Sequence, residues 1–161
     1  MNPVSIGAEI EIINLHKRYN LNGACLKSVI KKILQCVNKS RNMTSLDVVF
    51  MDDRAIKVLN KRYKGRNRPT DVLSFEFQDE PAKKAFAGEV IISVDRAREN
   101  SKVFGTDFKA ELVLYVIHGI LHLFGYDDMS EAKRRVMRRK ESEILRYLCT
   151  RENLSKVLTP R

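Results

Sequence analysis

The sequence predicts an α+β fold in which a single mixed β-sheet is packed with helices. Its 161 residues fit one domain, residues 1–161, with one core. Strand-like and helix-like segments alternate over residues 9–104, and the rest of the chain has helical patterns only. The segment 108–125 is apolar nearly all round, which is typical of a helix at the centre of a domain.

Two periodicities define the predicted elements. Strands are segments in which apolar residues alternate or run together, and helices are segments with apolar residues three and four positions apart. In chain order, the strands are expected over 9–16, 45–52, 71–77 and 89–94, and the helices over 23–40, 53–63, 95–104, 108–125 and 130–148.

Candidate N-cap residues support the predicted starts of the helices. Asn22 stands in the N-cap position of the first helix, whose apolar residues lie opposite its lysines. The last helix is expected to turn Val136, Ile144 and Leu148 inward and to leave its arginines outside. The candidate N-caps of the three helices between them are, in order, Asp52 or Asp53, Ser93 or Asp95, and Thr106 or Asp107.

Alternation also sets the faces of the third strand. Leu73, Phe75 and Phe77 face one way, and the residues between them face the other. Residues 78–88 are expected to connect this strand to the last one, whose continuous apolar run is typical of a buried strand.

The composition favours a polyanionic partner. Thirty Lys and Arg against twenty Asp and Glu give a net charge of +10, which suits nucleic acid; a merely soluble basic protein is the alternative. No signal peptide and no apolar run long enough to span a bilayer are visible, so we expect a cytoplasmic protein without a membrane partner. The cysteines Cys25, Cys36 and Cys149 lack CxxC spacing and are expected to be reduced thiols.

Two of the three histidines lie four residues apart in the central helix, within HGILHLFGYDD. Residues at this spacing share a helix face with Cβ atoms about 6 Å apart, so His118 and His122 can point at one ion. Gly125 then stands where a helix end favours a left-handed residue, and the chain can fold back so that Asp127 or Asp128 reaches a third coordination position. Two imidazoles and one carboxylate leave an open position on the metal, which is the catalytic pattern.

Each of these residues also has a simpler interpretation. A histidine on an apolar helix is often only a core residue with satisfied hydrogen bonds. Asp128 precedes the last helix and has Glu131 three residues on, which is an N-cap arrangement. The spacing alone therefore leaves open which aspartate binds a metal and which one caps the helix.

Taken together, these motifs resemble those of the YbeY family of endoribonucleases. HGILHLFGYDD is similar to the family signature HGxLHLxGYDH, whose three histidines bind the metal. PTDVLSFEF (residues 69–77) and GEVIIS (residues 88–93) resemble the second and third family motifs, and their order and spacing also fit. The resemblance covers nearly the whole chain. It implies an α+β, metal-dependent, single-strand-specific endoribonuclease acting in late small-subunit (16S-type) rRNA 3′-end maturation and ribosome quality control.

The resemblance assigns the metal site residue by residue. His118 and His122 match the first two family histidines, and Asp128 takes the position of the third. A carboxylate can bind zinc at a similar distance but also suits other divalent ions, so one divalent ion, preferably Zn²⁺, is the expected cofactor. Asp127 matches the family aspartate, for which we expect a turn-forming or ligand-positioning role, and it is also the candidate general base. Glu89 is the next candidate ligand.

A basic loop, KRYKGRNRP, precedes the second motif. Its cations can follow RNA phosphates and Tyr63 can stack on an unpaired base, although an ordinary solvated loop is the alternative. The family has a functional arginine where this chain has Lys64, which keeps the charge but not the bidentate fork; Arg66 or Arg68 could supply that fork. The candidates for RNA binding are Lys61, Arg62, Lys64, Arg66 and Arg68, and Lys64 is also a catalytic candidate.

Three functions stay open on the sequence alone. The first is a monomeric metal-dependent endoribonuclease that acts on the small-subunit rRNA precursor and associates with the small ribosomal subunit. The second is a non-catalytic, ribosome-associated RNA-binding factor with a structural metal, which a fourth protein ligand would favour. The third is a metal hydrolase of another substrate, such as a peptide. Gly119 disfavours peptide hydrolysis, because a metalloprotease of the HExxH type has its glutamate base at this position.

Overall fold

A four-stranded sheet forms the centre of the structure, a computed structural model that describes residues 7–37, 41–78 and 85–161. Its strand order is β1-β3-β5-β4. The first three strands in this order are parallel, and β4 pairs antiparallel with β5, so the mixed sheet and the α+β class are confirmed. The strands are β1 (Glu9–Asn14), β3 (Asn42–Met51), β4 (Val72–Phe77) and β5 (Ala85–Ser93).

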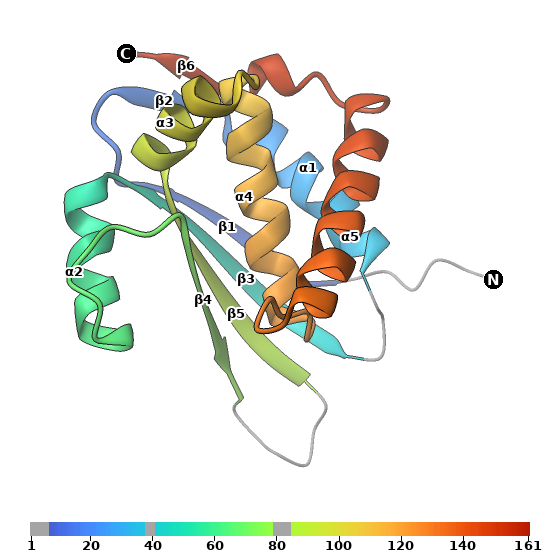
Figure 1. Cartoon of the computed structure of the whole chain (residues 1–161). Helices are drawn as coiled ribbons and strands as arrows, with labels where there is room; N and C mark the ends of the chain where they lie inside the picture. Colours follow the sequence, from blue (N-terminus) through green and yellow to red (C-terminus); the bar gives the residue numbers. More distant parts are fainter. Residues whose placement is uncertain (1–6, 38–40, 79–84) are drawn as a thin grey trace.

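Helices cover both faces of this sheet (Figure 1). They are α1 (Gly23–Cys36), α2 (Asp53–Lys64), α3 (Val94–Phe104), α4 (Phe108–Leu123) and α5 (Glu131–Cys149). α2 closes a small apolar cluster on one face, whereas α1, α4 and α5 close the main core on the other. α4 is the buried central helix that its sequence predicts. Within the described ranges, none of these helices has the length and apolar character needed to cross a membrane.

Side-chain caps fix where the helices begin. α5 begins after Ser130, whose hydroxyl accepts a hydrogen bond from the Lys133 N–H (3.2 Å). The N-cap interpretation of Asp128 is therefore wrong, and its carboxylate is available for other contacts. The caps of the first four helices are Asn22, Asp52, Ser93 and Asp107, and each accepts a hydrogen bond from the backbone N–H three residues further on.

Three strand boundaries differ from the predicted ones by two residues or more. β3 begins at Asn42, three residues before its predicted start. β1 ends at Asn14, two residues early. β5 begins at Ala85, so the first four residues of that strand were wrongly placed in the connection; Phe86 is buried there and pairs with Met43 of β3. Residues 38–40 of the predicted first helix and 79–84 of the predicted connection lie outside the described residues.

The inward face of α5 also needs a correction. Val136 is 55% exposed, and Met137 takes the inward position instead, together with Ile144 and Leu148. Adjacent residues on a helix lie about 100° apart around its axis, so an error of one position moves a side chain from the core to the surface.

A second sheet, which the sequence pattern did not predict, pairs the segment after β1 with residues close to the C-terminal end. β2 (Tyr19–Leu21) pairs antiparallel with β6 (Leu158–Pro160), which follows the short 3₁₀ helix η1 (Leu154–Lys156). Strands of three residues are too short to show a periodicity, so pairing of distant segments decides their structure.

Two glycines let α4 approach the sheet closely. A Cβ atom at Gly119 would lie 2.3 Å from Val90 Cγ1 and 3.0 Å from Val72 Cγ1, and one at Gly88 would lie 2.6 Å from Leu123 Cδ1. The hydroxyl of Ser74 in β4 also donates to the carbonyl of Gly119 (3.0 Å). The helix backbone is thus packed directly against β4 and β5 at the turn that carries the two histidines.

This packing predicts that Gly119→Ala lowers the free energy of unfolding by about 1–3 kcal/mol, because the added methyl group overpacks a buried site. Gly23→Ala is the matched control, since nothing lies within 4 Å of the added methyl group there. Urea unfolding of both variants measures the difference. Equal stabilities would show that α4 and the sheet do not pack as closely as described.

Candidate metal centre

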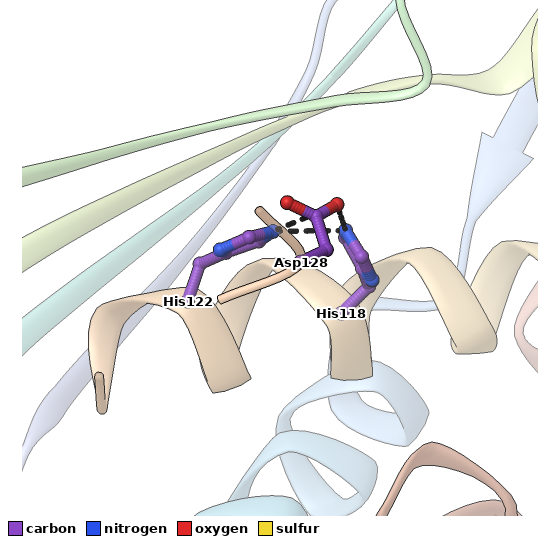
Figure 2. A group of neighbouring side chains, drawn as sticks. All are labelled: His118, His122 and Asp128. Carbon is purple, nitrogen blue, oxygen red and sulfur yellow. Dashed lines mark hydrogen bonds and ion pairs between the residues drawn. The ribbon is translucent and has the colours of Figure 1, made fainter. Parts of the chain in front are cut away.

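Three side chains that could hold a metal ion meet at the end of α4 (Figure 2). The Nε2 atoms of His118 and His122 face each other at 3.0 Å. Oδ2 of Asp128 stands opposite, 4.0 Å from each of them. The point equidistant from these three ligand atoms lies about 2.2 Å from each of them. This is close to the metal–ligand distances of zinc sites. In the part of the chain that the structure describes, this is the one cluster with metal-ligand character.

The turn after α4 brings Asp128 back over the histidines. α4 ends two residues before Gly125, whose N–H donates to the carbonyl of His122 (3.1 Å). Gly125 has a φ of 91°, a backbone conformation in which a side chain would be strained. The chain reverses there as predicted, and Asp128, not Asp127, faces the imidazoles.

Asp127 is engaged in the turn itself. One carboxylate oxygen accepts the Met129 N–H (3.1 Å), and the other accepts a hydrogen bond from the Lys133 ammonium (2.8 Å). The Lys133 contact and then the Met129 contact hold the pKa of Asp127 below its ordinary value. These contacts make it a turn-forming residue and leave it a weak base.

α5 contributes a further carboxylate that the sequence pattern did not reveal. Glu141 pairs with Nδ1 of His118, and its side chain is only 13% exposed. A carboxylate on the second ring nitrogen orients the imidazole and leaves Nε2 to face a metal. A signal was present: Glu141 lies on the inward stripe of α5, four residues after Met137 and three before Ile144.

The two imidazoles differ in their protonation. Burial lowers the pKa of His118, but the hydrogen bond to Glu141 and the charges of Glu141, Asp128 and Asp71 outweigh burial, and the net pKa is raised. Burial, helped by the charge of His118, lowers the pKa of His122. In the metal-free protein His118 therefore holds its proton to higher pH than His122 does. A metal that binds must displace that proton.

The cluster lines a cleft of about 580 Å³. Lys64 and Arg66 of the basic loop line the same cleft, so the structure brings two of the five predicted RNA-binding cations to the histidines. Lys61, Arg62 and Arg68 are exposed but lie outside this lining. Of the five predicted RNA-binding cations, those that share the cleft with the candidate metal site are thus Lys64, at the position of the family arginine, and Arg66.

A buried amide holds the basic loop in position. Asn60 is only 3% exposed, and its side-chain Nδ2 donates to the backbone carbonyl of Arg68 (2.8 Å). The backbone carbonyl of Asn60 accepts a hydrogen bond from the Arg66 N–H (3.3 Å). Gly65 ends α2 with a φ of 68°. Asn60 was not singled out from the sequence, although an asparagine on the inward face of an amphipathic helix signals such a contact.

Glu89 and Tyr63 lie on the other face of the sheet. Gly88 faces α4, so the next residue in the strand points away from it. Glu89 and Tyr63 line a separate, largely apolar groove of about 410 Å³, where the Tyr63 ring packs edge-on against Phe75. Burial and then Asp47 raise the pKa of Glu89. Neither residue lines the cleft with the histidines.

The fold and the cluster define a class of protein. It is an α+β protein whose cleft combines three candidate metal ligands with a lysine and an arginine, an arrangement suited to metal-assisted attack on a phosphodiester.

Comparison with known proteins narrows this class to a family. A family model described as Endoribonuclease YbeY matches residues 11–149. The chain belongs to the endoribonuclease YbeY family, as its motifs suggested.

Relatives with this name come from several bacteria. The Endoribonuclease YbeY of Desulfitobacterium hafniense is 37% identical, over 88% of this chain and 94% of that protein. The Endoribonuclease YbeY of Carboxydothermus hydrogenoformans is 33% identical, over 86% of this chain and 96% of that protein. The solution structure of TM1509 from Thermotoga maritima is 30% identical, covers 88% of this chain and 89% of that one, and superposes with a TM-score of 0.60.

The geometry predicts different roles for the two adjacent aspartates. Asp128→Ala should weaken zinc binding sharply, whereas Asp127→Ala should leave zinc affinity near normal. Asp128→His should restore binding, because imidazole is a softer ligand for zinc. Competition with a chromophoric chelator at one pH measures all three affinities. Zinc loss in Asp127→Ala with normal affinity in Asp128→Ala would exchange the two roles.

The contact on His118 yields a second prediction. Glu141→Gln should weaken zinc binding about 10–100-fold, because the imidazole loses the carboxylate that orients it. Glu143→Gln is the matched control, since Glu143 lies on the same helix, has a side chain that is 64% exposed and forms an ion pair with Lys140, away from His118. Equal zinc affinities for both variants would remove Glu141 from the metal centre.

Proposed function

We propose that this protein is a metal-dependent, single-strand-specific endoribonuclease that acts in 3′-end maturation of small-subunit rRNA and in ribosome quality control. One observation carries the proposal: the His118–His122–Asp128 cluster opens on the same cleft as Lys64 and Arg66. The names of the curated relatives support cleavage of RNA as the reaction.

His118, His122 and Asp128 would hold one divalent ion, and a donor set of two nitrogens and one oxygen fits Zn²⁺. When bound, the ion would act as a Lewis acid that lowers the pKa of water and polarises the scissile phosphate. Lys64 and Arg66 would hold the phosphate and offset the charge that develops in the transition state. The Arg66 guanidinium would offer the bidentate fork that Lys64 lacks.

A purely structural metal is the weaker alternative. Structural zinc sites use four protein ligands, whereas the cluster seen among the described residues has three and lines a cleft. Peptide hydrolysis by an HExxH mechanism is also disfavoured. A glutamate in place of Gly119 would meet Val90 and Val72, so the position that carries the base in those proteases faces the sheet.

The charge of the whole chain supports an RNA partner. The net charge of +10 favours association with a polyanion, and the cations of α5 between Lys133 and Lys140 are mostly exposed. We propose that the protein acts as a cytoplasmic monomer on the rRNA precursor in the small ribosomal subunit.

The proposal predicts that the purified protein cleaves single-stranded RNA from the 3′ region of the small-subunit rRNA precursor and spares a duplex of the same sequence. Replacing His118 and His122 together by alanine should abolish both cleavage and the metal content of about one ion per chain. Gel analysis of labelled RNA and metal analysis measure the two effects. Cleavage at the normal rate by the metal-free double variant would place the reaction elsewhere.

Salt dependence tests the phosphate contacts. Each phosphate contact with single-stranded RNA contributes about 0.7 to the slope of log affinity against log salt. Replacing Lys64 and Arg66 together by alanine should therefore flatten that slope by about 1.4. Replacing Lys27 and Lys31, two exposed lysines of α1, removes the same charge outside the cleft lining. Equal slopes for the two double variants would show that Lys64 and Arg66 do not contact the RNA phosphates.

A further inference from the structure

Among the residues that the structure describes, four carboxylates line the cleft, and three of them already have partners. Asp128 faces the imidazoles, Glu141 pairs with His118, and Asp127 accepts hydrogen bonds within its own turn. The fourth is Asp71, the residue before β4. Its side chain makes no hydrogen bond or ion pair with any residue in the described ranges.

The backbone of Asp71 is fixed beside the ligand-bearing turn. Its carbonyl accepts the Ser93 N–H (3.0 Å), which ties the start of β4 to the end of β5. The next residue, Val72, is the side chain that a Cβ atom at Gly119 would meet at 3.0 Å. Gly119 directly follows His118. Asp71 thus stands on the cleft wall beside the metal cluster, with its position set by the main chain and its carboxylate uncommitted.

We propose that Asp71 accepts the proton of the attacking water, a role that rests on the endoribonuclease function proposed above. The water oxygen forms a bond to phosphorus while one of its protons passes to the Asp71 carboxylate. The bond between phosphorus and the leaving ribose oxygen breaks, and that oxygen takes up a proton from solvent. Asp71 then returns its proton to solvent, so that the hydrolysis balances in atoms and charge.

The surroundings of Asp71 suit this role. Asp71 as a whole is solvent-exposed, yet desolvation of its carboxylate by neighbouring groups is the largest cause that raises its pKa. The positive charges of Arg96 on α3 and of His118 on α4 act in the opposite direction, and Asp53 on α2 adds to the increase. Tyr115 on α4 is electrostatically coupled to Asp71: burial, with a contribution from the charge of Asp71, raises the pKa of that phenol. A carboxylate with a raised pKa is a stronger base, which suits a proton acceptor.

Asp71→Asn tests the proposal, because the amide keeps the shape of the side chain and removes its basicity. Single-turnover cleavage at neutral pH should fall about 10²–10⁴-fold. Zinc affinity, and the RNA affinity of the metal-free protein, should stay at wild-type levels. The wild-type rate should rise with pH as Asp71 loses its proton, and the variant should lack this part of the profile. Glu99→Gln, an exposed carboxylate of α3 outside the cleft lining, is the control and should keep the wild-type rate and profile.

Two results would overturn the assignment of Asp71. The first is wild-type cleavage by Asp71→Asn, and the second is a loss of cleavage that accompanies a loss of zinc, since Asp71 would then act through the metal. If Asp71→Asn does not fold, Asp71→Glu decides: cleavage with a shifted pH profile supports a proton acceptor, and an unchanged profile contradicts it. Failure of the wild-type protein to cleave RNA would instead refute the proposed function itself.

Discussion

The close approach of α4 to the sheet is the constraint on which the site depends. Gly119 and Gly88 remove the two side chains that would hold the helix away from β5. Because a helix presents a new face every 100°, placing Gly119 against Val90 fixes the direction of His118 and His122 as well. The same contact puts Val72, and therefore the start of β4, beside the histidines. A single packing interaction thus aligns the metal-ligand candidates with one wall of the cleft.

Carboxylates from different elements then take different roles in one cleft. The turn after α4 supplies Asp128 to face the imidazoles, α5 supplies Glu141 to orient His118, and the start of β4 supplies Asp71. The carboxylates of the cleft also differ in pKa. Hydrogen bonds hold the pKa of Asp127 below its ordinary value, whereas desolvation raises the pKa of Asp71. Acid–base chemistry and metal binding can share a cleft when neighbouring groups differ in this way.

Local patterns predicted most of the fold and the centre of the site. The spacing of His118 and His122, the glycine at the helix end and the alternation in β4 are properties of short segments, and the structure has all three features. Which of Asp127 and Asp128 faces the imidazoles could not be predicted from the HGILHLFGYDD segment alone. It depended on Ser130 capping α5, which freed Asp128, and on Lys133, which engages Asp127.

Tertiary contacts account for what the sequence did not show. Glu141 reaches His118 across 23 residues of chain, and Asn60 anchors a loop whose course no periodicity describes. The early start of β5 follows from pairing with β3, and the outward position of Val136 follows from how α5 docks. Pairing and docking depend on partners that are distant in sequence, so the signals within each segment were ambiguous.

The central claim is that cleavage of RNA depends on one metal ion held by His118, His122 and Asp128. The most direct measurement is a titration of Zn²⁺ into chelator-treated wild-type protein while the cleavage of single-stranded RNA is followed. Cleavage should be absent without metal, rise in proportion to added zinc and level off at one ion per chain. Full cleavage by the metal-free protein, or a rise that bears no relation to one bound ion, would contradict the claim.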